Sequence, residues 1–218
     1  MASKLRVAIT GGNGFVGTKL ARYWLGTTFK RSNFKGVHIL SFDDYDGFLK
    51  DRPIHCPKRD VLPEWPGFPD INPDNEFERV SANMQDPTGD WREALADVDA
   101  VVHLAAVNPY PDCNWMDSAQ SMGVTANVLA ACQQNDVRRF IFASSNHVVG
   151  NYFRQGALLN PPQAPALTPS TPYQPDVFQT GAKDPLVDAT PYSTAKIAGE
   201  VMVNTAVATT PGLSAISV

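Results

Sequence analysis

The sequence predicts an α/β protein built on a parallel sheet. Short apolar stretches alternate with helical ones along the chain, and most of these apolar stretches lack a polar face. In addition, a glycine-rich turn joins the first apolar stretch to the first helical one. Strands that are buried on both faces and separated by helices are typical of parallel sheets with helices on each side.

The expected elements follow one another with few interruptions. Strands are expected at residues 5–10, 37–42, 77–82, 99–105, 138–144 and 213–218. Helices are expected at 14–25, 90–96, 115–134 and 192–209, where apolar residues recur with helical spacing.

Two proline-rich stretches interrupt this alternation. Residues 51–75 and 151–191 hold too many prolines for a central strand or a helix interior. We expect both to be insertions in one domain that covers 1–218, because this length fits a single compact domain. The second insertion suits either a cover over a substrate or a plain surface loop. Because the sequence stops inside the last expected strand, we expect it to be part of a longer protein.

The composition argues against several classes of function. The chain is 43% hydrophobic and 18% charged, which is ordinary for a soluble domain. Its net charge of −4 does not suit nucleic-acid binding, and no apolar run approaches the ~20 residues that cross a membrane. Cys56, Cys113 and Cys132 are spaced for neither a disulfide framework nor a metal site. We therefore expect free thiols, no metal and a cytoplasmic location.

A glycine-rich turn stands between the first strand and the first helix. Residues 10–17 read TGGNGFVG, with glycines at 11, 14 and 17. Such a turn lets backbone N–H groups approach a pyrophosphate at the helix N-terminus. A tight turn alone also favours glycine, but the strand before and the helix after favour nucleotide binding. The sequence therefore predicts a Rossmann-type, doubly wound sheet that holds a dinucleotide.

An acidic pair, Asp43 and Asp44, ends the second strand. A carboxylate at this place accepts hydrogen bonds from the adenosine ribose and repels a 2′-phosphate. No arginine follows directly, so NAD is expected rather than NADP. A solvated acidic turn is the alternative interpretation.

A tyrosine and a lysine open the last helix on one face. Tyr192 and Lys196 are four residues apart, which places them one turn from each other. A free tyrosine, with a pKa of about 10, is a poor base at neutral pH. We expect the ammonium of Lys196 to stabilise the phenolate, lower the pKa of Tyr192 and permit acid–base catalysis. The alternative is a tyrosine at a helix start beside a surface lysine.

Polar residues follow the fifth strand, in the segment SSNHVVG at 144–150. Ligands of open α/β sheets bind at the carboxyl ends of the strands. We therefore expect Ser145 to hydrogen-bond a substrate hydroxyl, and Asn146 and His147 to contact the substrate. A structural hydrogen bond is the alternative role for His147.

Together these motifs resemble the extended short-chain dehydrogenase/reductase family, also called the NAD-dependent epimerase/dehydratase family. TGGNGFVG, VDAVVHLAA at 98–106, SSNHVVG and YSTAK stand in the family's order. The resemblance implies a Rossmann fold that binds NAD, carbohydrate chemistry, and a catalytic trio of Ser145, Tyr192 and Lys196. It also implies a small C-terminal substrate domain that this chain lacks. The implied cofactor contacts are Gly11, Asn13, Gly14, Phe15, Val16, Gly17, Asp43, Asn83, Met84, Leu104, Ala105, Ala106, Tyr192 and Lys196.

The chain departs from the family's pattern at two polar positions. Asn83 stands where an aspartate commonly accepts from the adenine amino group, and an amide oxygen can still accept there. Ser121 stands where the family often has an asparagine linked to its proton relay.

Within the family, SSNHVVG is similar to the corresponding segment of uronate dehydrogenases. We therefore expect NAD-dependent oxidation of a hydroxyl of a sugar or sugar acid. A nucleotide-sugar epimerase and an NAD-binding protein without catalysis are the alternatives. The expected partners are a sugar or nucleotide-sugar substrate and, through the helices at 115–134 and 192–209, a second copy of the chain. No nucleic-acid or membrane partner is expected.

Overall fold

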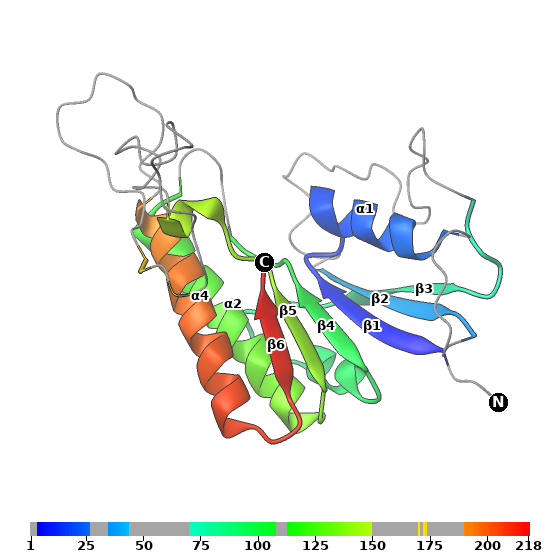
Figure 1. The fold of residues 1–218 in the computed structure, drawn as a ribbon. Coiled ribbons are helices and arrows are strands. Elements are labelled where there is room, and N and C mark those ends of the chain that lie inside the picture. Colours follow the sequence, from blue (N-terminus) through cyan, green and yellow to red (C-terminus); the bar gives the residue numbers. More distant parts are fainter. Residues whose placement is uncertain are drawn as a thin grey trace.

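The computed structural model describes residues 4–26, 35–43, 70–107, 113–149, 170, 172–173 and 190–218. These residues form a parallel six-stranded sheet with helices on both sides (Figure 1). The strands are β1 (Leu5–Thr10), β2 (Val37–Asp43), β3 (Glu76–Ser81), β4 (Ala100–His103), β5 (Arg139–Phe142) and β6 (Ser214–Ser217). The helices are α1 (Phe15–Trp24), α2 (Trp115–Gln134) and α4 (Thr190–Thr209), with the 3-10 segments η2 (Asp90–Leu95) and η3 (Asn146–Val149).

The order of the strands reverses in the middle of the sheet. The order is β3-β2-β1-β4-β5-β6, so β1 lies beside both β2 and β4. Thr10, the last residue of β1, pairs with Phe42 on one side and with His103 on the other. A crevice at such a reversal is where doubly wound sheets bind ligands. The predicted fold class is confirmed.

Alternating side chains of the strands fill the two layers of the core. In β1, Val7 and Ile9 pack with Ala21 of α1, whereas Ala8 belongs to the layer that holds Val128 of α2. All five side chains are almost fully buried. Burial on both faces explains why the strand sequences lack a polar face.

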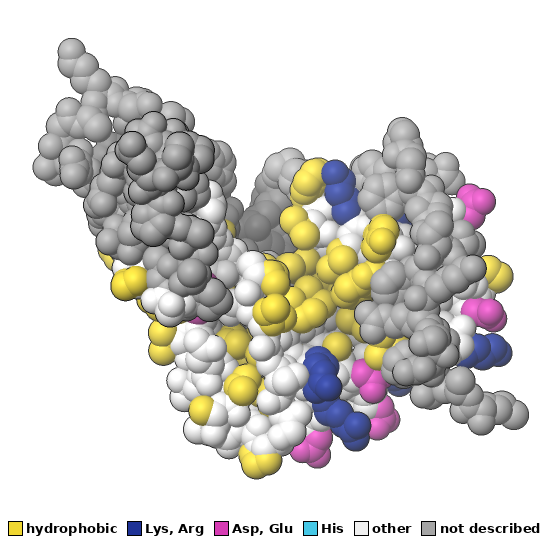
Figure 2. All heavy atoms as spheres, in the orientation of Figure 1, with side chains coloured by type: hydrophobic (Ala, Val, Ile, Leu, Met, Phe, Trp, Pro, Cys, Tyr) yellow, Lys and Arg dark blue, Asp and Glu magenta, His cyan; other side chains and the backbone are white. Residues whose placement is uncertain are grey.

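The two faces of the sheet are covered unequally. Helices α2 and α4 pack against each other on one face, and α1 packs on β1 and β2 on the other. Among the described residues, no helix lies over β5 and β6 on the α1 side (Figure 1). Apolar side chains gather there in the space-filling view (Figure 2), and Ile216 of β6 is 56% exposed. Among all the described residues, no helix is both long and apolar enough to cross a membrane.

The expected elements are all present, with differences at their ends. The strand expected at 99–105 ends at His103, because Leu104 and Ala105 turn toward the glycine turn. The segment at 90–96 is a 3-10 helix, and Asp97 leaves it with a positive φ of 60°. The short segment η3 was not expected. The proline-rich stretches lie mostly outside the described residues, so the single-domain organisation stays a prediction.

Candidate active site

The glycine turn is built by close approach of backbone to backbone. Gly11 has a φ of +69°, and a Cβ there would lie 2.9 Å from the backbone nitrogen of Ala105. A Cβ at Gly17 would lie 2.5 Å from the carbonyl oxygen of Gly11. The turn, the start of α1 and the loop after β4 therefore touch without side chains between them. Only glycine permits this packing at both positions.

The first turn of α1 fits a dinucleotide's phosphates. Its N-cap residue is Gly14, which has no side chain to cover the helix end, and its first turn holds no acidic residue. Phe15 and Val16 follow with exposed fractions of 53% and 59%. An uncapped helix N-terminus that carries no negative charge is favourable for a phosphate.

The other expected cofactor residues lie around this turn in different environments. The carboxylate of Asp43, at the end of β2, accepts a hydrogen bond from the backbone N–H of Asn13 at 3.0 Å. Asn83 is exposed, and its side-chain oxygen already accepts from the N–H of Gln85. Met84 is buried in the core layer that contacts α2. Asp44 lies outside the described residues.

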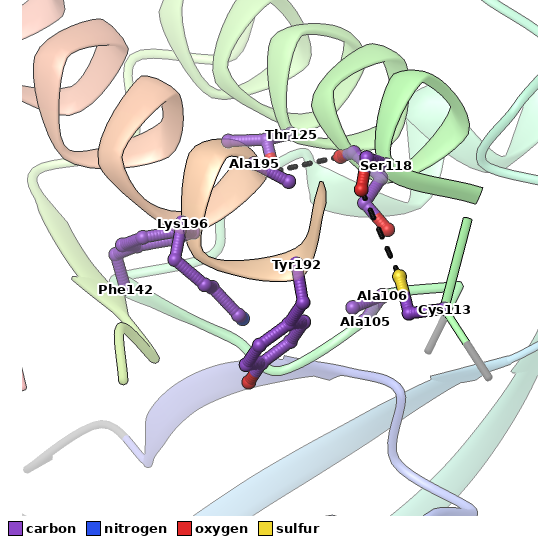
Figure 3. A pocket seen from close by; sticks show the side chains of 10 residues that line it. Ala105, Ala106, Cys113, Ser118, Thr125, Phe142, Tyr192, Ala195 and Lys196 are labelled. Atoms are coloured by element: carbon purple, nitrogen blue, oxygen red, sulfur yellow. Dashed lines mark hydrogen bonds between the residues drawn. The ribbon is translucent and has the colours of Figure 1, made fainter. Parts of the chain in front are cut away.

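The expected catalytic residues come together at the carboxyl end of β5. The side chain of Ser145 acts on the hydroxyl of Tyr192, in the direction that lowers the pKa of Tyr192. Lys196 donates to the carbonyl oxygen of Ala143 at 2.6 Å, and its Nζ lies 5.7 Å from the centre of the Tyr192 ring. Tyr192 and Lys196 extend from α4 into one pocket (Figure 3). The pocket is lined by Ala105, Ala106, Cys113, Ser118, Ser121, Thr125, Phe142, Tyr192, Ala195 and Lys196.

The pocket and the glycine turn share a wall. Ala105 lines the pocket, and its backbone nitrogen is the atom that a Cβ on Gly11 would meet. A ligand that lies along the turn can therefore reach the pocket past Ala105. This is the arrangement that the predicted dinucleotide needs, with its phosphates at one end and its reactive ring at the other.

The electrostatics of the pair differ from the sequence expectation. Burial raises the pKa of Tyr192 above its usual value, and Ser145 only partly offsets this rise. The expected lowering of the Tyr192 pKa by Lys196 was wrong. Lys196 is only 8% exposed and is directed to Ala143. Burial lowers the pKa of Lys196 to about 8, because its charged form has lost water.

The polar residues after Ser145 take different positions. His147, on η3, meets the Tyr192 ring edge-on, with ring centres 5.7 Å apart. Its backbone N–H donates to the hydroxyl of Ser145 at 3.2 Å. Asn146 is exposed, and its side-chain oxygen accepts from Ser145 at 3.4 Å. Both residues therefore lie beside the pair that the sequence predicted to be catalytic.

A buried histidine behind the pocket was missed by the sequence prediction. His103 Nδ1 lies 2.7 Å from the hydroxyl of Thr10, and its Nε2 lies 3.0 Å from the hydroxyl of Thr125. The Thr125 hydroxyl donates to the carbonyl of Ser121, so His103 Nε2 is the donor and its Nδ1 the acceptor. Burial lowers the pKa of His103 to about 3. The sequence did carry a signal for this role, because His103 is a polar residue at the end of the buried strand β4.

Ser121 supports the loop after β4. Its hydroxyl accepts from the N–H of Val107 at 2.9 Å and donates to the carbonyl oxygen of the same residue at 3.0 Å. The serine therefore ties helix α2 to the segment that carries Ala105 and Ala106. Cys113 also lines the pocket and was not predicted to do so.

Comparisons with known proteins agree with this geometry. The model of a family described as "NAD dependent epimerase/dehydratase family" matches residues 7–218. The "Uncharacterized UDP-glucose epimerase YtcB" of Bacillus subtilis is 25% identical over 174 residues, which are 78% of this chain and 47% of that protein. The "L-arabinose 1-dehydrogenase (NAD(P)(+))" of Haloferax volcanii is 38% identical over 114 residues, which are 51% of this chain and 40% of that protein. The matched regions span less than half the length of these curated relatives.

Solved structures show the same fold. A UDP-glucuronic acid 4-epimerase from Bacillus cereus, in complex with UDP-glucuronic acid and NAD, superposes with a TM-score of 0.62 at 18% identity. The superposition covers 98% of this chain and 55% of the epimerase. At this identity the likeness supports the fold alone.

Proposed function

Because the chain belongs to the NAD dependent epimerase/dehydratase family, we propose that it carries the cofactor and catalytic site of an NAD-dependent oxidoreductase acting on a sugar or sugar-acid hydroxyl. The family assignment agrees with the resemblance found in the sequence. The observation that carries the proposal is that Tyr192 and Lys196 enter one pocket, which shares Ala105 with the glycine turn (Figure 3).

The residues of this chain fit NAD at the turn. Gly11 and Gly17 keep side chains out of the turn, the uncapped start of α1 would hold the phosphates, and Asp43 would accept hydrogen bonds from the adenosine ribose. Phe15 and Val16 lie exposed in the first turn, where their backbone is open to the phosphates. When bound there, NAD supplies the acceptor of the hydride that leaves the substrate carbon.

Tyr192 takes the proton of the substrate hydroxyl, and Ser145 orients the same oxygen through a hydrogen bond. The ammonium of Lys196, 5.7 Å from the ring, offsets the negative charge that forms on the phenolate. Because burial raises the pKa of Tyr192, the proton transfer becomes easier as the pH rises above neutral. Loss of the Lys196 proton, with a pKa of about 8, limits that gain.

Two observations favour oxidation over epimerisation. The L-arabinose 1-dehydrogenase is 38% identical over the matched region. Asn146 and His147 offer polar groups beside Ser145, as a free sugar or a uronate would need. The finer proposal is a uronate dehydrogenase-like reaction, in which a cyclic sugar acid becomes its lactone. The similarity to YtcB favours a nucleotide-sugar epimerase as the second candidate.

The outer surface of α4 suits a second copy of the chain. Val201 and Val207 are 51% and 36% exposed on this helix, which packs beside α2. We expect the protein to form a homodimer through these helices, which sedimentation measurements check.

The function is tested with the variant Tyr192→Phe. We expect the wild type to form NADH with at least one aldose, uronate or aldonate. The variant should lose turnover by about 100- to 10,000-fold, because it lacks the acid–base group. Its affinity for NAD should stay within about twofold, since Tyr192 is not in the glycine turn. Tyr23→Phe, at an exposed tyrosine of α1, is the matched control.

Three outcomes separate the candidates. Unchanged turnover in Tyr192→Phe removes this residue from the mechanism. No NADH from any sugar, together with NAD that stays bound through purification, supports the epimerase instead. Failure to bind NAD contradicts both enzymatic candidates.

The choice of cofactor is tested with Asp43→Ala. We expect the wild type to prefer NAD, and the variant to gain affinity for NADP because a charge that repels the 2′-phosphate is gone. A wild type that binds both equally would contradict the role of Asp43.

A further inference from the structure

Three polar side chains on one stripe of α4 hold the end of β5. Tyr192, Lys196 and Glu200 are four residues apart, so successive turns of the helix present them on the same side. Lys196 donates to the carbonyl of Ala143, and Tyr192 is the residue whose pKa Ser145 lowers. The carboxylate of Glu200 accepts a hydrogen bond from the hydroxyl of the residue between them, Ser144. The first two side chains belong to the proposed catalytic site, and the third has no role in it.

The packing of the helix brings Glu200 within reach of Ser144. A Cβ on Gly199 would lie 2.2 Å from the ring of Phe142, so this glycine lets the ring lie directly against α4. The side chains of Phe142 and Ser144 are two residues apart and share one side of an extended chain. The contact between Phe142 and α4 therefore determines how closely Ser144 approaches this helix.

Ser144 is held from two directions. Its backbone N–H donates to the carbonyl of Val218 at 2.8 Å, next to β6, and its hydroxyl donates to Glu200 on α4. Ser145 follows immediately, so its place relative to Tyr192 is fixed through Ser144. Without the Glu200 contact, only the bond to Val218 would hold this residue.

The second oxygen of Glu200 holds another part of the chain. It accepts from the hydroxyl of Tyr173 at 2.9 Å. Tyr173 lies in the sequence between Ser145 and Tyr192, inside the proline-rich stretch. Both bonds have a carboxylate as acceptor, and such bonds are about twice as strong as neutral ones.

We propose that Glu200 is a positioning residue: by holding Ser144 and Tyr173, it fixes Ser145 opposite Tyr192. This inference rests on the proposed function of Ser145 and Tyr192. Glu200 itself touches neither side chain of that pair in the described contacts. Its loss should therefore change the alignment of the pair while the glycine turn keeps its affinity for NAD.

The first test measures kcat, KM and NAD affinity for Glu200→Ala and Ser144→Ala. We expect each to lower kcat by about 10- to 100-fold, which is the size of effect that small misplacements of reacting groups produce. NAD affinity should stay within about twofold. Glu200→Gln and Ser144→Thr, which keep an acceptor and a hydroxyl, should recover most of the rate. Asn204→Ala, at an exposed position one turn further along α4, is the matched control.

The double variant distinguishes positioning from general loss of structure. If Glu200 acts through Ser144, the combined variant should be no slower than Glu200→Ala alone, because the two residues share one contact. The proposal would be overturned if the fold losses in kcat of Glu200→Ala and Ser144→Ala multiplied in the double variant. An equal loss of kcat, NAD affinity and melting temperature in Glu200→Ala would also overturn it.

A second measurement does not depend on turnover. The pKa of Tyr192 is followed by NMR of ¹³C-labelled tyrosine, with its signal assigned by its absence in Tyr192→Phe. Since Ser145 in its present place lowers this pKa, its displacement in Glu200→Ala should raise the pKa, and Glu200→Gln should raise it less. An unchanged pKa in Glu200→Ala overturns the proposal even if no sugar is oxidised. A raised pKa in a protein without turnover supports the positioning role while the proposed function fails.

Discussion

The glycine turn and the proposed catalytic group of Ser145, Tyr192 and Lys196 lie at the same edge of the sheet, but they are built in opposite ways. The turn depends on missing side chains: Gly11 and Gly17 allow backbone to touch backbone. The catalytic group depends on polar side chains that α4 holds against the end of β5. The comparison teaches that the turn fails when an atom is added, whereas the catalytic group fails when a hydrogen bond or a charge is removed.

The two regions also differ in their contact with water. The start of α1 is open, with Phe15 and Val16 more than half exposed. Lys196 is nearly buried, and His103 behind it is 1% exposed. Variants at the turn should therefore act on ligand binding, and variants near the pocket should act on the pH dependence of stability.

The largest effect on NAD affinity is expected for Gly17→Ala. The added Cβ would lie 2.5 Å from the Gly11 carbonyl and 2.8 Å from the Cα of Gly12, so backbone must move. We expect NAD affinity to fall about 100-fold, or roughly 3 kcal/mol. Gly123→Ala in α2 is the matched control, because a Cβ there would meet nothing within 4 Å. Calorimetric titration with NAD measures both, and equal affinities would break the contrast.

Replacement of the buried lysine should stabilise the fold while it removes activity. The folded protein binds the Lys196 proton with a pKa of about 8, against 10.5 for the exposed group. Burial of the charged Lys196 therefore lowers the free energy of unfolding by its full amount below pH 8, and this loss is relieved as the pH rises toward 10.5. We expect Lys196→Met to raise the free energy of unfolding at pH 7 by about 1–3 kcal/mol.

Urea unfolding at several pH values checks this expectation. The difference in the free energy of unfolding between Lys196→Met and the wild type should shrink between pH 8 and pH 10.5. A difference that does not change with pH would show that packing, rather than charge, stabilises the variant.

The buried histidine predicts the same direction of pH dependence as Lys196, but in a lower pH window. The folded protein keeps His103 neutral, with a pKa of about 3, while the unfolded chain takes up a proton near 6.5. Its contribution to stability is present above pH 6.5 and is lost as the pH falls toward 3. The slope should be about 1.4 kcal/mol per pH unit below 6.5.

His103→Gln should remove this slope between pH 6.5 and pH 5, above the range in which most carboxylates titrate. His38→Gln, on strand β2, should keep it. Equal slopes in the wild type and His103→Gln would mean that His103 is protonated in the folded protein.

The smallest effect is expected for a glycine outside both regions. A Cβ on Gly123 of α2 would meet nothing within 4 Å. Gly123→Ala should raise the free energy of unfolding by about 0.5–1 kcal/mol, because alanine loses less freedom in a helix. NAD affinity should not change. A loss of binding here would contradict the view that the glycines of the turn are special because of their contacts.

Sequence patterns predicted the order of the elements and most of the candidate site. The inner strands β1, β2 and β4 could be found because they are buried on both faces, whereas the edge strands β3 and β6 are more exposed. Ser145, Tyr192 and Lys196 were expected at one edge of the sheet because parallel strands end there. The end of β4 was harder, since Leu104 still reads as a strand residue and leaves the sheet only through packing on the turn.

The missing parts of the prediction depend on contacts between distant segments. The pKa of Tyr192 was expected to fall, but its direction is set by burial, which one helix cannot reveal. The bond between Ser144 and Glu200 joins β5 to α4. A third polar residue at the spacing of Tyr192 and Lys196 was a readable signal for it. The tautomer of His103 could be assigned only from its contact with the hydroxyl of Thr125, which lies on α2.

The short segment η3 carries side chains beside the proposed catalytic group but lies apart from the glycine turn. Asn146 and His147 lie on this single turn beside Ser145 and Tyr192, away from the glycine turn at 11–17. Under the proposed function, exchanging these side chains should change which hydroxylated compound reacts while the glycine turn keeps its affinity for NAD. For engineers, this makes residues 146–149 the natural place for a library aimed at new substrates.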